Sequence, residues 1–182
     1  YPAHKRQIGS IGKPLETNEM IILNDNDIPV DYGVEGEICI RGYNVAVGYL
    51  GDKKINLAFR NGWFHSGDFG VKDKRGNYFF HGRHDSLIIK GGENIYPAEI
   101  ESILYKHHAV DECAVIGIPD KMLGEEIAAA IVVKEGQICS ETDVKNYAQE
   151  KIAKFKIPKK IFFVNEIPKG ATGKLQRNVL AK

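Results

Sequence analysis

Three segments of the sequence hold side chains that could take part in chemistry. The first, residues 63–68, ends in Ser-Gly-Asp, and the two carboxylate oxygens of Asp68 could accept both hydroxyl groups of a ribose. The same residues are also typical of a tight turn in which Asp68 only caps its own backbone. Taken alone, this segment favours the turn.

The second segment, residues 82–101, contains the adjacent glycines Gly91 and Gly92. Paired glycines let a backbone approach a ligand closely. However, a linker, a strand, a glycine turn and a helix would give the same pattern. His84 is a lone histidine in this segment, and we assign no role to it.

The third segment, residues 168–174, ends in Gly-Lys but is not a phosphate-binding P-loop. Pro168 stands where that motif needs its first glycine, and Leu175 follows the lysine in place of Ser or Thr. Lys174 could be a mobile ammonium that reaches a phosphate or carboxylate oxygen. The alternative is a solvated loop lysine with no role.

The elements that must position these residues change in character along the chain. Short runs at residues 19–23 and 36–42 predict strands, and residues 71–80 predict a hairpin that turns at residues 74–77. Short strands with glycine punctuation indicate a small barrel-like β-unit. After Gly82 we expect a helix that opens at Pro97, strands at 110–118, 127–133 and 160–164, and a helix that begins after Ser140. The predicted fold class is α+β, with a β-rich subdomain at residues 1–83 and a compact α+β domain at 84–182.

Composition sets the broad class of protein. Hydrophobic residues make up 43% and charged residues 27% of the 182 residues, as in soluble globular proteins. No apolar run is long enough to span a bilayer. The three cysteines are scattered and show no Cys-x-x-Cys spacing, so we expect neither disulfides nor a metal site. This cysteine usage favours the cytoplasm.

The charge is unevenly placed. Residues 145–182 contain ten Lys or Arg and two acids, a local net charge of +8, whereas the whole chain has +1. A solvated basic face is the usual explanation, and attraction of polyphosphate ligands is the functional one. Nucleic-acid binding ranks lowest, because few aromatic residues lie among the basic ones.

Each segment is ambiguous alone, but their order and spacing together resemble the adenylate-forming superfamily. The matching motifs are Gly-Trp-Phe-His-Ser-Gly-Asp, Gly-Arg-x-Asp, Gly-Gly-Glu-Asn-Ile-Tyr-Pro-Ala-Glu-Ile-Glu and Pro-Lys-Gly-Ala-Thr-Gly-Lys. Residues 9–14 and 36–42 add upstream matches, so the resemblance covers nearly the whole chain. The glycine-rich motif is more similar to fatty-acyl and aryl-CoA synthetases than to peptide-synthetase modules.

The resemblance implies an acid–thiol ligase. Such enzymes activate a carboxylic acid with ATP and Mg²⁺ to an acyl-adenylate, and CoA then releases AMP and forms a thioester. It also implies that residues 84–182 are a mobile C-terminal lid that turns about Asp85 as its hinge. Lys174 on this lid would enter the site during adenylation and act as the catalytic cation.

The resemblance also assigns binding residues. Asp68 would bind the ribose hydroxyls with the help of Arg83, and Phe80 would touch the nucleotide. Gly91 and Gly92 would line the path of the CoA pantetheine after the lid has turned. No residue of this chain is assigned to a metal.

The sequence departs from the family pattern in one respect. The phosphate loop and the acyl pocket that the family carries upstream are absent, so the resemblance is to a C-terminal fragment that we expect to be inactive alone. We expect a fatty acid as the substrate of the parent enzyme, while chain length and oligomeric state are not indicated. The alternative is a non-enzymatic interaction or nucleic-acid-binding module, which the basic stretch and the missing half-site would suit.

Overall fold

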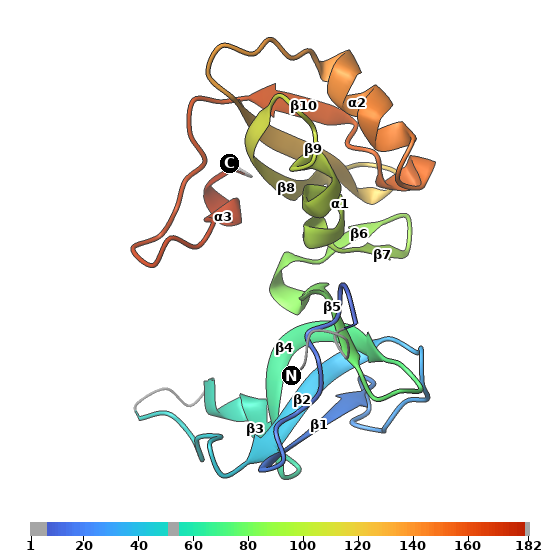
Figure 1. Cartoon of the computed structure of the whole chain (residues 1–182), viewed down its shortest axis with the longest axis vertical. Coiled ribbons are helices and arrows are strands. Elements are labelled where there is room, and N and C mark those ends of the chain that lie inside the picture. The colour runs from blue at the N-terminus through green and yellow to red at the C-terminus, as the bar shows by residue number, and fades with distance from the viewer. Residues whose placement is uncertain (1–6, 51–54, 181–182) are drawn as a thin grey trace. The chain divides into compact units, whose positions relative to one another are not determined.

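The computed structural model describes residues 7–50 and 55–180 (Figure 1). The chain divides into two compact units, the first ending at Asp85 and the second beginning at Ser86. Each unit is built around its own five-stranded sheet. Among the described residues, none of the helices combines the length and the apolar character needed to cross a membrane.

The first unit is a curled antiparallel sheet. Its strands run in the order β1-β2-β4-β3, and β5 pairs with the long, strongly bent β4 (Figure 1). The strands are β1 (Asn18–Leu23), β2 (Gly36–Gly42), β3 (Phe59–Arg60), β4 (Trp63–Lys72) and β5 (Tyr78–Arg83). Ile22, Ile38 and Tyr78 form the buried core of this unit, because alternate residues of each strand face inward.

Local sequence determines the β4–β5 turn. The Asp73 carboxylate accepts hydrogen bonds from the backbone N–H groups of Arg75 and Asn77, both at 2.8 Å. Gly76 has a φ of +81°, a conformation that glycine adopts at little steric cost. The predicted hairpin, with its turn at residues 74–77, is confirmed.

The second unit packs helices against a mixed sheet. Its strands run β10-β9-β6-β7, with β8 also paired to β9. The β9–β10 pair is parallel, and the pairs β6–β7, β6–β9 and β8–β9 are antiparallel. The strands are β6 (Ile88–Lys90), β7 (Glu93–Ile95), β8 (Val110–Asp120), β9 (Gly124–Val133) and β10 (Lys160–Phe163). The α-helices are α1 (Pro97–Leu104), α2 (Glu141–Gln149) and α3 (Arg177–Leu180), and a 3₁₀ turn covers Lys154–Lys156. Another 3₁₀ turn, His84–Ser86, contains the last residues of the first unit and the first residue of the second.

The core of this unit lies between the sheet and the helices α1 and α2. It includes Ile100 and Leu104 of α1, Val144 of α2 and Ile127 of β9, none of which is exposed. Ser140 caps α2 in a capping box, accepting from the Asp143 N–H while the Asp143 carboxylate accepts from the Ser140 N–H. The expected α+β class, with a barrel-like β-subdomain and a compact α+β domain, is confirmed.

Candidate functional site

A β-bulge places Asp68 on the bent strand β4. The ladder between β2 and β4 pairs Cys39 with His65 and Glu37 with Phe69, so three residues of β4 lie opposite one residue of β2. Within the bulge Gly67 has a φ of +73°. A bulge bends the strand and redirects a side chain. The interpretation of this segment as a simple turn with Asp68 as its own cap is therefore wrong.

Ser66 fixes the bulge through its hydroxyl group. It donates to the Ile38 carbonyl at 2.6 Å and accepts from the Asp68 N–H at 3.0 Å. The backbone on both sides of Gly67 is thereby tied to the neighbouring strand. The position of Asp68 is set by the sheet and not by a flexible loop.

Asp68, Arg83 and Asp85 form a small charged cluster. The Arg83 Nη1 lies 2.9 Å from Asp68 Oδ1, and its Nε lies 3.2 Å from Asp85 Oδ1. The pairing of β4 with β5 sets Asp68 directly opposite Arg83. Burial raises the pKa of the Asp68 carboxyl, and the Arg83 guanidinium opposes that rise. The structure thus brings together three of the predicted site residues within the first unit.

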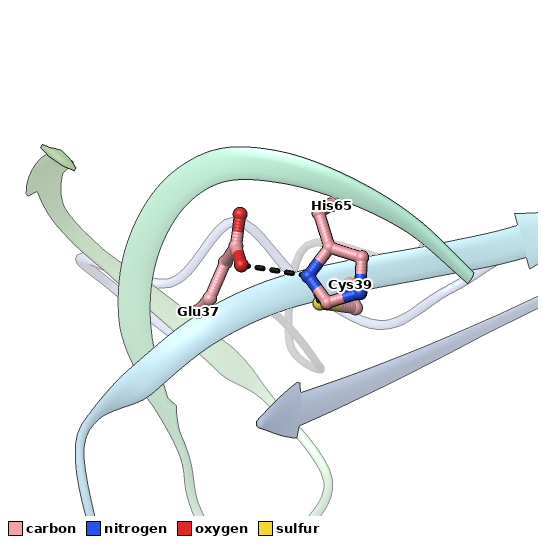
Figure 2. Close-up of side chains that lie close together, drawn as sticks. All are labelled: Glu37, Cys39 and His65. Carbon is pink, nitrogen blue, oxygen red and sulfur yellow. Dashed lines mark hydrogen bonds and ion pairs between the residues drawn. The ribbon is translucent and has the colours of Figure 1, made fainter. Parts of the chain in front are cut away.

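A buried network supports the bulge from below (Figure 2). Glu37 Oε2 lies 2.7 Å from His65 Nδ1, and Glu37 Oε1 accepts the Gly67 N–H at 2.8 Å. The Sγ atom of Cys39 lies 3.3 Å from the same His65 nitrogen. The Glu37 carboxylate therefore joins the imidazole to the residue next to Asp68.

Glu37, Cys39 and His65 also bring metal-ligand atoms within 4.8 Å of one another. Two observations oppose a metal at this place. The guanidinium of Arg60 lies 3.8 Å from Glu37 Oε2 and repels a cation. Burial and the neighbouring Glu37 raise the pKa of the Cys39 thiol to about 12, which disfavours the thiolate that binds metals. We interpret the cluster as a hydrogen-bonded support for the bulge.

Phe80, Gly91 and Gly92 occupy exposed positions. Phe80 lies on β5 and is 40% exposed. The two glycines form the two-residue turn between β6 and β7, with φ of +60° and +88°, which is the turn chemistry that a tight hairpin requires. The Gly91 N–H donates to the Leu123 carbonyl at 2.8 Å and so fixes this turn.

Lys174 lies at the end of a tight loop in the second unit. The Gly170 N–H donates to the Lys174 carbonyl at 2.8 Å, and the Gly173 N–H donates to the Gly170 carbonyl at 2.9 Å. The side chain of Lys174 is exposed. Within the described part of the chain, its ammonium has no hydrogen bond or ion pair. Hydrogen bonds therefore fix the backbone at Lys174, while its ammonium group is accessible to a ligand.

Several basic residues of the stretch 145–182 form ion pairs with acids from other elements. Lys156 pairs with Glu99 at 2.7 Å, Lys169 with Glu112 at 2.6 Å, and Arg177 with Glu101 at 2.8 Å. These pairs anchor parts of the basic stretch to other elements of the second unit.

Comparisons with known proteins identify the family. The family model described as AMP-binding enzyme matches residues 1–50, and the model described as AMP-binding enzyme C-terminal domain matches residues 99–174. The chain belongs to the AMP-binding enzyme family. It is 41% identical to an oxalate–CoA ligase of Arabidopsis thaliana and 43% identical to a 2-succinylbenzoate–CoA ligase of Bacillus mycoides.

These alignments cover 96% and 97% of the chain but 34% and 36% of the relatives, so the chain spans about a third of their length. It corresponds to the C-terminal part of such enzymes. Among solved structures it is similar to o-succinylbenzoate CoA synthetase from Bacillus subtilis in complex with an acyl-adenylate intermediate. That match has a TM-score of 0.92 and 40% identity over 97% of this chain and 36% of that one.

An anthranilate CoA ligase in complex with anthranoyl-AMP is also similar, with a TM-score of 0.89 and 37% identity over 99% of this chain and 36% of that one. These relatives are named for oxalate, 2-succinylbenzoate and anthranilate. None of these acids is a fatty acid. The expected preference for a fatty acid therefore finds no support among them.

Proposed function

We propose that this chain is the C-terminal part of an AMP-forming acid–CoA ligase. The enzyme would join a carboxylic acid to the α-phosphate of ATP, releasing pyrophosphate, and then transfer the acyl group to the CoA thiol, releasing AMP. Mg²⁺ would enter with the nucleotide, and we assign no residue of this chain to it. The observation that carries the proposal is the Asp68–Arg83 pair, held on a supported bulge in a chain of this family.

Asp68 would accept the ribose hydroxyls of ATP, because a carboxylate offers two oxygens to a vicinal diol. Its side chain is 35% exposed, so it is accessible to a ligand while still held by Arg83. Phe80 is exposed on β5, the strand that also carries Arg83, and would contact the nucleotide. These roles place nucleotide binding in the first unit.

Lys174 would stabilise negative charge during adenylation. A carboxylate that attacks a phosphate is opposed by like charges, and a positioned cation lowers that barrier. Its ammonium is exposed and has no acidic partner among the described residues. A compact point charge on a held backbone suits this task.

Residues 84–182 would form a mobile lid that alternates between the two half-reactions. Asp85, the last residue of the first unit, would be the hinge. After rotation, the turn at Gly91 and Gly92 would line the pantetheine path, where the absence of side chains allows close approach. The acid pocket would lie outside these residues, so we expect the 182 residues alone to be inactive.

The full-length enzyme tests this proposal through acid-dependent ATP–pyrophosphate exchange. The acids assayed are oxalate, 2-succinylbenzoate, anthranilate and a fatty acid, each followed by addition of CoA. We expect exchange with at least one acid, and then AMP and a thioester in equal amounts. Release of ADP without AMP contradicts the proposed reaction.

Lys174→Ala tests the catalytic cation in the same enzyme. We expect exchange to fall by about 10²–10³-fold, the range seen when one charge-stabilising group is removed. Thioester formation from a supplied acyl-adenylate should remain. Lys154→Ala is the matched control, since Lys154 is another exposed lysine of the second unit. Equal losses in both half-reactions contradict the role of Lys174.

A further inference from the structure

Arg177 links the Lys174 loop to helix α1. It follows Lys174 by three residues, and its Nη2 lies 2.8 Å from both carboxylate oxygens of Glu101. The Glu101 residue is only 8% exposed. Hydrogen bonds between two charged groups are the strong ones, and low solvent access strengthens them further.

Glu101 is itself held rigidly. It lies on α1 beside Ile100, which is completely buried, and its Oε1 also accepts the Val115 N–H of strand β8 at 2.8 Å. A buried carboxylate is costly unless it is paired. Arg177 supplies the pairing charge. The segment that follows Lys174 is therefore bound to the core of the second unit.

The other end of the loop is held as well. Lys169 Nζ lies 2.6 Å from Glu112 Oε1 on β8, and Lys169 also forms a backbone bridge with Leu175. The Gln176 N–H donates to the Pro168 carbonyl at 2.9 Å and closes the base of the loop. Lys169 is exposed while Glu101 is buried, so the Arg177 contact is the stronger of the two anchors.

We propose that the Glu101–Arg177 pair is a latch that positions Lys174 for adenylation, so that Arg177 and Glu101 are positioning residues. This inference rests on the proposed role of Lys174. A charge acts on a reacting phosphate only when it is correctly placed, and a misplacement of about 1 Å costs on the order of 10²-fold in rate. Loss of the latch should therefore impair adenylation and leave thioester formation from a supplied adenylate unchanged.

The experiment measures both half-reactions in the full-length enzyme with the acid that supports exchange. The variants are Arg177→Ala, Arg177→Lys, Lys174→Ala and the double variant Arg177→Ala/Lys174→Ala. The matched control is Arg41→Ala, which removes another arginine–glutamate pair, Arg41 with Glu19, from an exposed place in the first unit. Circular dichroism confirms that each variant is folded.

We expect Arg177→Ala to lower the exchange rate by about 10–100-fold and to change thioester formation by less than about 3-fold, with Arg41→Ala unchanged in both. The double variant should be no slower than Lys174→Ala alone, because residues that act as a unit are not additive. A general structural role would instead reduce both half-reactions and would add to the loss from Lys174→Ala. Either of those results overturns the latch.

Two outcomes separate this inference from the function on which it rests. If Lys174→Ala leaves exchange intact, the proposed role of Lys174 fails and the latch fails with it. If Lys174→Ala abolishes exchange but Arg177→Ala does not change it, only the latch is overturned. If Arg177→Ala does not fold, Arg177→Lys replaces it in the test. A loss of exchange without a loss of thioester formation then supports the latch. No loss of exchange, or an equal loss in both half-reactions, overturns it.

Discussion

Replacement of Glu37 by alanine tests the support beneath the Asp68 bulge. The substitution removes the acceptor for two groups at once, the Gly67 N–H at 2.8 Å and the His65 Nδ1 at 2.7 Å. The His65 side chain is 2% exposed and that of Glu37 is 18% exposed, so water cannot readily replace the lost carboxylate. Each buried donor left without a partner costs about 1–3 kcal/mol.

The Gly67 N–H loses its acceptor, whereas His65 Nδ1 keeps the Cys39 Sγ at 3.3 Å. The expected loss of stability is therefore about 1–3 kcal/mol, a sizeable part of the 5–15 kcal/mol that is typical of a domain. The chain contains a single tryptophan, Trp63, which lies on β4 two residues before His65. Its fluorescence during urea unfolding reports on the first unit alone. We expect the midpoint to fall sharply with little change in the slope.

Glu35→Ala is the matched control for this measurement. Glu35 contacts His81 in the same unit, but the two side chains are 34% and 37% exposed. Exposed ion pairs contribute about 0–1 kcal/mol, so this variant should unfold close to the wild type. An unchanged midpoint for Glu37→Ala would refute the reasoning, and so would equal losses in the two variants.

Four further results are expected. Ser140→Ala should destabilise the second unit by about 1 kcal/mol, because helix α2 loses its cap. Unfolding of this unit is followed by far-UV circular dichroism, since Trp63 lies in the first unit. Hydrogen bonds from Ser140 lower the pKa of the Asp143 carboxyl in the folded chain. The carboxylate therefore stabilises α2 at any pH above its unfolded-state pKa, and this stabilisation is lost as the pH falls through the lowered folded-state pKa. An NMR titration of Asp143 should show a pKa below the ordinary value of an aspartate. Ile100→Ala, at a completely buried position, should cost about 2–5 kcal/mol in urea unfolding followed by circular dichroism. Asp85→Pro should impair one half-reaction of the full-length enzyme more than the other, because proline fixes φ at the proposed hinge; unchanged rates in both would remove Asp85 from that role.

Local patterns in the sequence predicted the elements that local interactions determine. Pro97 opens α1, and Ser140 caps α2, as their positions indicated. These signals act within a few residues, so they need no knowledge of the fold. The end of α2 carries no such local signal: the helix ends at Gln149, and Ile152 packs against the core from outside it.

Long-range pairings could not be predicted in this way. The bulge at Asp68 depends on how β2 aligns with β4, and the Glu37–His65 contact joins residues 28 positions apart. Neither residue stood out as a site residue, because a glutamate on a short strand and a histidine among aromatics are common. The roles of Asp68 and Lys174 came from the resemblance to a family, since each motif alone had an ordinary explanation.

The contact between Glu101 and Arg177 joins residues 76 positions apart. We expect a contact across such a separation to form late in folding, after the local helices and hairpins, because a long loop must first be ordered. An interaction that is absent from the transition state affects the rate of unfolding and leaves the rate of folding unchanged. Loss of this pair should therefore shorten the lifetime of the folded second unit without slowing its formation, so that resistance to proteases and to heat inactivation depends on the residues that hold Lys174 in place.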